Sequence, residues 1–125
     1  VYEAVEYRAD GRTTWFGRFD PQTGQFSEGR LPLGGYVHAG FDPAGRFDFI
    51  EHAGPLHQIL SVHPGDPLEV GELVRLNSPD HEQQRHHAHP FLSPDRRRLF
   101  FTDWDGDGFA QICSIDVSDL TQEPH

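Results

Sequence analysis

The chain has 125 residues and therefore room for one domain at most. Hydrophobic residues make up 35% and include 10 Phe, enough for a packed core, whereas 13 Gly and 10 Pro argue against long helices and favour tight turns. The formal net charge of −10 disfavours a general attraction to nucleic acid or to an anionic membrane surface, so we expect neither as a partner.

Neither a membrane-spanning segment nor a signal peptide is expected from the sequence. No apolar run is long enough to span a bilayer, and the first residues lack the charged-then-apolar order of a signal peptide. The sequence therefore does not distinguish a cytoplasmic from a periplasmic location. The chain begins at Val1 and contains no Met, which is expected of a processed chain, of one excised from a longer protein, or of a fragment.

The first predicted unit covers residues 1–33 and has strands at residues 14–19 and 25–27. Residues 20–24 are rich in turn formers and predict the hairpin between these strands. No stretch of the chain sustains the i, i+3, i+4, i+7 apolar spacing of an amphipathic helix. We therefore expect essentially no helix.

The second predicted unit covers residues 34–78 and is a complete set of four strands. Its first two strands are joined by a turn at residues 43–45, where Pro43 fixes φ and Gly45 tolerates a positive φ. On the second strand Phe47 and Phe49 share one face at period two. The four strands are expected near residues 35–42, 47–52, 58–62 and 72–76.

The third predicted unit covers residues 79–125 and stops after three strands. These strands are expected at residues 86–92, 98–102 and 111–117. An incomplete unit leaves an open sheet edge, which invites pairing with another strand.

Two segments of the chain repeat each other. Residues 38–49 match residues 89–100, so that His38 aligns with His89, 51 positions later. A strand-rich repeat of about 40–50 residues is typical of β-propeller blades. We therefore predict an all-β fold, a β-propeller fragment of about two to three four-stranded antiparallel blades. Because closed propellers have at least ~4 blades, we expect the remaining blades or another copy of the chain as partners.

Nine His residues are unevenly placed, and four of them fall in residues 81–89. On a strand, His87 and His89 would point to one face, and the repeat places His38 at the position equivalent to His89. Innermost strands of different blades converge on the propeller axis, so these imidazoles can approach each other there. With Gln84, the set predicts a divalent-metal site for Mn, Fe, Zn or Ni. The alternative is a set of polar residues that line a channel and bind water.

Three further residues are candidates for contact with a substrate. His52 and His57 flank the turn at residues 53–55 and are candidate general bases, because His titrates near neutrality. Their alternative role is that of hydrogen-bonded turn histidines. Arg85 lies beside the His-rich segment and offers a planar fork for a substrate carboxylate, or it is an exposed surface Arg.

Two other features each have a functional and a structural interpretation. Residues 103–108 match the D-x-D-x-D-G opening of a calcium loop, but Ser114 stands where the bidentate Glu is needed. A tight Asp- and Gly-rich hairpin explains the same residues.

The single Cys113 excludes an intrachain disulfide and lies in an apolar stretch, where we expect a buried, unreactive thiol.

The His-rich region resembles the C-terminal part of the oligogalacturonate lyases. Residues 84–95, followed by residues 99–103 and Gly106, are similar to that family's Q-x-x-H-x-H-P segment and its F-S-P-D-G strand pair. The resemblance implies a β-propeller that cleaves oligogalacturonides in pectin degradation by β-elimination, with Mn²⁺ held by one Gln and three His. By resemblance, Gln84, His87 and His89 fall on three of those ligands, and His38 is the candidate for the fourth.

A second, shorter match covers residues 50–57 and is similar to the family's F-C-H-E-G-P segment. Glu51 stands in place of the family's Cys and Ala53 in place of its Glu. The strand pair also resembles TolB-like and WD40-like repeats, and residues 17–24 are similar to virginiamycin B lyase-like propellers. Two functions therefore stand side by side: a metal-dependent lyase acting on an acidic oligosaccharide, and a non-catalytic propeller module for binding or scaffolding.

Overall fold

The predicted all-β fold class is confirmed by a computed structural model of the chain. The structure describes residues 2–8, 11–33, 38–45, 47–53, 56–77 and 87–121, and side chains from Thr14 onward. These residues form three separate antiparallel sheets and one short helical turn. Within them, no helix has the length and hydrophobicity of a membrane span.

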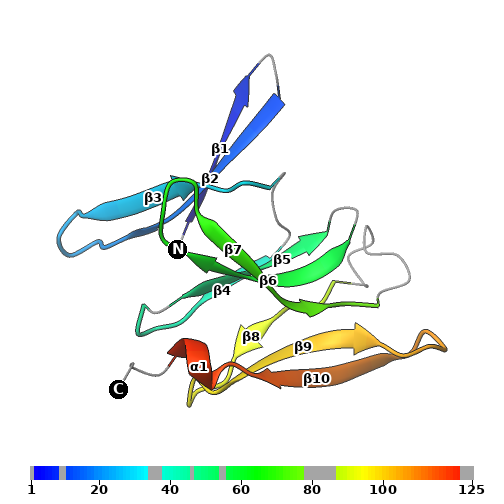
Figure 1. Cartoon of the computed structure of the whole chain (residues 1–125). Helices are drawn as coiled ribbons and strands as arrows, with labels where there is room; N and C mark the ends of the chain where they lie inside the picture. The colour runs from blue at the N-terminus through cyan, green and yellow to red at the C-terminus, as the bar shows by residue number, and fades with distance from the viewer. Residues whose placement is uncertain are drawn as a thin grey trace.

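The first sheet, drawn uppermost in Figure 1, has the strand order β1-β2-β3. Its strands are β1 (Tyr2–Arg8), β2 (Gly11–Phe19) and β3 (Phe26–Arg30). The sequence pattern predicts β2 and β3, whereas β1 was not expected from it. In the turn after β2, Gly24 donates its N–H to the carbonyl of Asp20 at 2.8 Å and adopts φ 73°, a conformation that Gly enters without steric cost.

The second sheet lies in the middle and is a four-stranded meander with the order β4-β5-β6-β7. Its strands are β4 (His38–Phe41), β5 (Asp48–Ala53), β6 (His57–His63) and β7 (Glu69–Arg75). All neighbours are antiparallel, as short hairpin connections require.

The third sheet lies lowest in Figure 1 and contains β8 (Phe91–Leu92), β9 (Arg98–Trp104) and β10 (Ala110–Asp116), followed by α1 (Ser118–Thr121). The prediction that His87 and His89 lie on a strand is wrong, because β8 begins only at Phe91. His89 has φ 47°, outside the β region, and Pro90 has no N–H to donate to a neighbouring strand. The strand therefore does not extend upstream of Phe91.

The second and third sheets begin with the same backbone pattern. Gly40 pairs with Phe49 between β4 and β5, and Phe91 pairs with Phe100 between β8 and β9. Each of these residues lies 51 positions from its counterpart. The two hairpins therefore share one register.

The turns of these two hairpins are also alike. Gly45 donates its N–H to the carbonyl of Asp42 at 2.8 Å, and Arg96 donates to that of Ser93 at 2.9 Å. Gly45 and Arg96 both adopt positive φ, 79° and 62°. In addition, the guanidinium of Arg96 donates from Nη2 to Oδ2 of the fully buried Asp42 at 2.8 Å. The two turns are thus linked to each other across the sheets.

Two hydrophobic cores lie on opposite faces of the second sheet. Because successive side chains of a strand alternate between faces, Phe49 of β5 belongs to one core and its neighbour Ile50 to the other. The core toward the first sheet contains Phe16, Leu31, Ile50, Leu60, Val62 and Leu68. The core toward the third sheet includes Phe49, Ile59, Leu99, Phe101 and Val117. The backbones of the second and third sheets approach each other at their first strands, β4 and β8.

Candidate functional site

The candidate site is built around Glu51, a fully buried carboxylate on β5. Burying a charge is costly unless it is hydrogen-bonded, and each oxygen of Glu51 accepts two hydrogen bonds. Oε1 accepts from His38 Nδ1 at 2.9 Å and from the N–H of His89 at 3.1 Å. Oε2 accepts from His57 Nε2 at 2.6 Å and from the N–H of Ala88 at 2.6 Å.

These four partners come from both sides of a sheet-to-sheet junction. His38 is paired directly opposite Glu51 in the register of β4 and β5, and His57 is the first residue of β6. The N–H groups of Ala88 and His89 belong to the irregular segment before β8. The Glu51 carboxylate therefore ties the start of the third sheet to the second.

The hydrogen bonds decide the charge of Glu51. Burial by itself raises the pKa of this carboxyl group, but the donors from His57, Ala88, His38 and His89 outweigh burial and lower the pKa from 4.5 to about 2. Glu51 is therefore ionised at neutral pH. An ionised carboxylate only accepts hydrogen bonds, so the ring nitrogens that face it, Nδ1 of His38 and Nε2 of His57, carry hydrogens. In the neutral ring of His38 the lone pair is then on Nε2.

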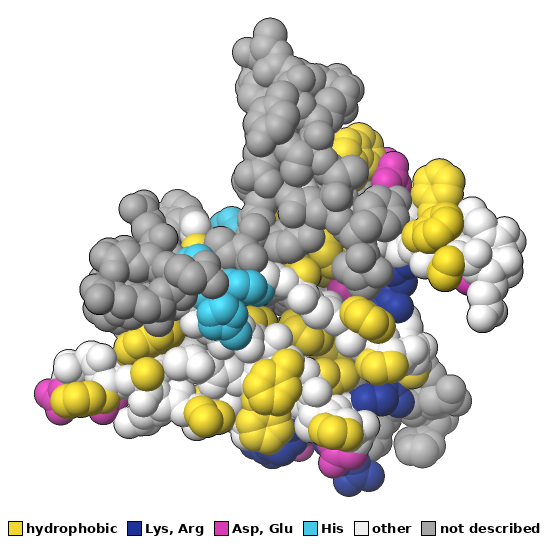
Figure 2. All heavy atoms as spheres, turned by 180° about the vertical axis from the view of Figure 1, so that it is seen from behind, with side chains coloured by type: hydrophobic (Ala, Val, Ile, Leu, Met, Phe, Trp, Pro, Cys, Tyr) yellow, Lys and Arg dark blue, Asp and Glu magenta, His cyan; other side chains and the backbone are white. Residues whose placement is uncertain are grey.

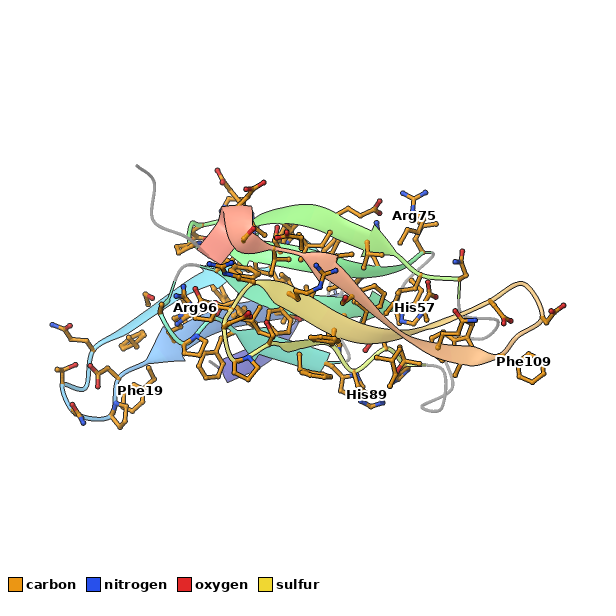
Figure 3. The ribbon with its side chains drawn as sticks, turned by 90° about the horizontal axis from the view of Figure 1, so that it is seen from below. Phe19, His57, Arg75, His89, Arg96 and Phe109 are labelled. Atoms are coloured by element: carbon orange, nitrogen blue, oxygen red, sulfur yellow. The ribbon has the colours of Figure 1, made fainter. Side chains whose placement is uncertain are left out.

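Four imidazoles gather around this carboxylate, and we call His38, His57, His87 and His89 the histidine cluster. The ring centroids of His38 and His89 are 4.1 Å apart, and those of His38 and His87 are 5.4 Å apart. His87 lies 6.4 Å from His89 and 6.5 Å from His57. Figure 2 shows histidine side chains in one patch on this face, and Figure 3 shows His57 and His89 at the same end of the strands.

The spacing of the cluster suits metal ligation, although no ligand set is yet complete. With nitrogens about 2.1 Å from an ion, the ring centres of two imidazole ligands lie roughly 4–6 Å apart. The pairs His38–His89 and His38–His87 fall within that range, whereas the 6.4 Å between His87 and His89 exceeds it. Within the described part of the chain, however, no three His, Cys, Asp or Glu side chains already stand in an arrangement that could hold a metal ion. The predicted ligand Gln84 and the predicted substrate residue Arg85 lie outside the described residues.

The structure separates the two histidines that the sequence suggested as general bases. His57 is buried in the cluster and bonded to Glu51. His52 follows Glu51 on β5, so strand alternation directs its side chain to the opposite face. Burial, and then repulsion from His57, lower the pKa of His52, and its Nδ1 has no hydrogen-bond partner among the described residues.

Glu51 is the functional residue that sequence reasoning missed. It was noted only as a replacement within the family motif. A signal was present, because Glu51 continues an otherwise apolar run of β5 after Phe49 and Ile50. A carboxylate at such a position has to find partners inside the protein.

The remaining motifs have structural roles. In the turn between β9 and β10, Oδ1 of Asp105 accepts the N–H groups of Asp107 at 2.9 Å and Phe109 at 3.0 Å, as expected of an Asp-rich hairpin. Cys113 on β10 is only partly buried, in contrast to the buried thiol expected from its apolar neighbours, because it lies on the outermost strand of the sheet.

Comparison with known proteins does not place the chain in a family. No protein-family model, curated protein or solved structure matches it. A function is therefore inferred from the histidine cluster, Glu51 and the surfaces beside them.

Proposed function

We propose that this chain carries the divalent-metal site of a lyase that cleaves oligogalacturonides by β-elimination, with Mn²⁺ as the favoured metal. The ligands are His38, His87 and His89, with Gln84 as the fourth. One observation carries the proposal: His38 and His89, 51 residues apart and on different sheets, have ring centroids only 4.1 Å apart. Imidazoles gathered in this way are the commonest protein ligands of divalent transition metals.

The accompanying fold proposal is that the three sheets are successive blades of a β-propeller. Three observations support it. The second sheet is packed between the other two, the second and third sheets begin with the same register, and they approach each other at β4 and β8. Blades that radiate from an axis come closest at their innermost strands, which would bring His38 and His89 to the channel.

Glu51 supports the metal proposal through the ring of His38. Metal-binding His residues usually donate their second ring N–H to a carboxylate or carbonyl, which fixes the tautomer and the orientation of the ring. His38 has this arrangement, because its Nδ1 faces Glu51 at 2.9 Å and Nε2 is left for a ligand. The buried His57 holds the other oxygen of Glu51 and so keeps the carboxylate in place.

The proposed reaction removes the proton α to a uronate carboxylate. A bound divalent cation would withdraw charge from that carboxylate and stabilise the enolate-like intermediate. A base takes the C5 proton, the C4–O bond breaks, its electrons leave with the sugar oxygen, and the C5–H electrons form the C4=C5 double bond. Arg85 would orient the substrate. His57 is occupied by Glu51 and His52 faces the other side of β5, so neither is favoured by the geometry as the base.

Metal analysis of purified protein tests the proposal. His89→Gly removes an imidazole and keeps φ 47° accessible, since Gly adopts positive φ freely. His87→Ala removes the second ligand, and His63→Ala, which changes a histidine outside the cluster, is the matched control. We expect stoichiometric metal in the wild type and in His63→Ala and loss of metal in both cluster variants. Ultraviolet absorbance of the unsaturated product then reports lyase activity on oligogalacturonides.

A non-catalytic propeller module is the second candidate function. It is favoured by the absence of a complete ligand set among the described residues and by the fact that Glu51 is fully hydrogen-bonded without a metal. In that case the histidines only line a surface. Wild-type protein that is purified without chelator and contains no stoichiometric metal would favour this second function over the first.

A further inference from the structure

The third sheet turns one face toward the second sheet and the other face away from the rest of the chain. Phe101 of β9 packs into the core toward the second sheet, so its neighbours Phe100 and Thr102 lie on the opposite face. Phe91 is paired opposite Phe100, and Ile112 is paired opposite Thr102. We call the surface formed by Phe91, Phe100 and Ile112 the distal face. The third sheet lies lowest in Figure 1, so Figure 3, seen from below, looks toward the distal face.

The distal face is apolar and strongly exposed. Ile112 is 83% exposed and Phe91 is 57% exposed. Phe91 is stacked on Phe100 with ring centroids 5.5 Å apart, and Ile112 lies diagonally across the strand pair from Phe100. Neighbouring large apolar groups on one face of a sheet mark a surface that packs against another protein element.

The second sheet shows what covers a face of this kind. Phe49 stands at the strand position of Phe100, and Ile59 stands at that of Ile112, because the residues opposite Ile59 and Ile112 are also 51 positions apart. Phe49 is 2% exposed and Ile59 is 0% exposed. Both lie in the core that the third sheet covers. The same residue types at matching positions are therefore buried by a sheet in one case and exposed in the other.

The first sheet also has an exposed aromatic face, at the other end of the row of sheets in Figure 1. Phe16 of β2 packs toward the second sheet, so Phe19, three positions later, lies on the opposite face. Phe26 of β3 is paired opposite Phe19, and the two side chains are 66% and 54% exposed. The row of sheets therefore ends in an aromatic face on each side.

We propose that a second copy of this chain docks head to tail, with its Phe19–Phe26 face against the distal face. The order of packing within the chain supports this direction. The second sheet places its Ile50 face on the first sheet and receives the third sheet on its Phe49 face. Continued in the same order, the sheet that follows the third is the first sheet of the second copy.

The number of sheets sets the size of the assembly. Head-to-tail contacts either close into a ring or continue as a filament. The described residues form three sheets, so two copies supply six and three copies supply nine. Closed propellers typically have about 4–8 blades, so two copies would close a ring with two identical interfaces. The inference rests on the blade arrangement within the proposed function, but the metal ligands have no part in it.

The experiment is sedimentation equilibrium of the full chain at about 10–100 μM and roughly 0.15 M salt, which screens the repulsion between two chains of charge −10. Ile112→Lys changes the distal face, and Phe26→Lys changes the face of the first sheet. Phe109→Lys is the matched control, because Phe109 is 69% exposed and Figure 3 shows it at the far end of the β9–β10 hairpin. All three side chains are largely in solvent within one chain, and thermal unfolding checks that each variant folds.

We expect the wild type and Phe109→Lys to sediment with twice the mass of one chain. Ile112→Lys and Phe26→Lys should each weaken association by at least about 100-fold, because each buries an unpaired charge at both interfaces. An equal mixture of these two variants should associate more tightly than either alone, since one interface of the mixed pair keeps both wild-type faces.

Three results would overturn the inference: a wild type that stays monomeric, assemblies larger than two copies, or loss of the dimer in Ile112→Lys but not in Phe26→Lys, which indicates face-to-face packing. Metal content of the same samples separates this inference from the proposed function. A monomer with stoichiometric metal contradicts only the docking, whereas a dimer without metal contradicts only the metal site.

Discussion

Two buried carboxylates, Asp42 and Glu51, join the second and third sheets in different ways. Both are fully buried and both reach across the same junction. Asp42 pairs with the guanidinium of Arg96, a group that stays charged at any ordinary pH. Glu51 instead accepts from two imidazoles and two backbone N–H groups. The guanidinium of Arg96 therefore makes a link with a permanent charge, whereas each imidazole beside Glu51 uses only one of its two ring nitrogens for the carboxylate.

The largest effect is expected from Glu51→Gln. The amide of Gln presents an N–H₂ group where the carboxylate has an acceptor, so buried donors at one oxygen lose their partner. Breaking such a buried network costs about 3–5 kcal/mol of unfolding free energy. Urea denaturation measures the change. A loss below about 1 kcal/mol would show that the four hydrogen bonds contribute little to the fold.

Asp42→Asn is expected to cost about 2 kcal/mol, less than Glu51→Gln. The Asn side chain retains an oxygen that can accept the N–H of Ala44, which is 3.1 Å from Oδ1 in the wild type. It loses the charge-assisted bonds from Arg96. Metal content should stay at the wild-type level, because Asp42 is neither a proposed ligand nor one of the four hydrogen-bond partners of Glu51. Loss of metal in Asp42→Asn would show that Asp42, like Glu51, supports the metal site.

The stability of the wild type should depend on pH more strongly than the stability of Glu51→Gln. The pKa of Glu51 is lowered in the folded protein from 4.5 to about 2. The unfolded chain therefore binds a proton first as pH falls, so the stabilisation is present above pH 4.5 and is lost between 4.5 and about 2. The slope from this group is at most about 1.4 kcal/mol per pH unit. Urea midpoints across this range should fall more steeply for wild type than for Glu51→Gln, and parallel curves would contradict the assignment.

The smallest effect is expected from Glu72→Ala, which removes an exposed carboxylate. Glu72 forms an ion pair with Arg75 at 3.1 Å, but the two side chains are 38% and 58% exposed, so water screens the pair. Exposed pairs of this kind contribute well under about 1 kcal/mol. Thermal unfolding should therefore be nearly unchanged. An effect as large as that of Asp42→Asn would mean that burial is not what distinguishes the carboxylates at the sheet junction.

The sequence by itself determined the features that depend on near neighbours. Alternating apolar residues and turn formers predicted most of the strands of the all-β fold, and Pro43 and Gly45 marked a turn whose Gly does adopt positive φ. The repeat aligned His38 with His89, and the structure places their rings side by side. The strand and turn inferences succeeded because strand period and turn chemistry are local properties of the chain, whereas the closeness of His38 and His89 depends on how the sheets pack.

Only the tertiary structure decided what surrounds Glu51. Its oxygens accept the N–H groups of Ala88 and His89, 37 and 38 residues away in the sequence, and no local pattern encodes that approach. The same packing placed His57 in the histidine cluster, whereas strand alternation alone directs His52 to the other face of β5. The charge, burial and partners of a side chain depend on residues brought close by folding, so the sequence could name candidate histidines but not the carboxylate that holds them.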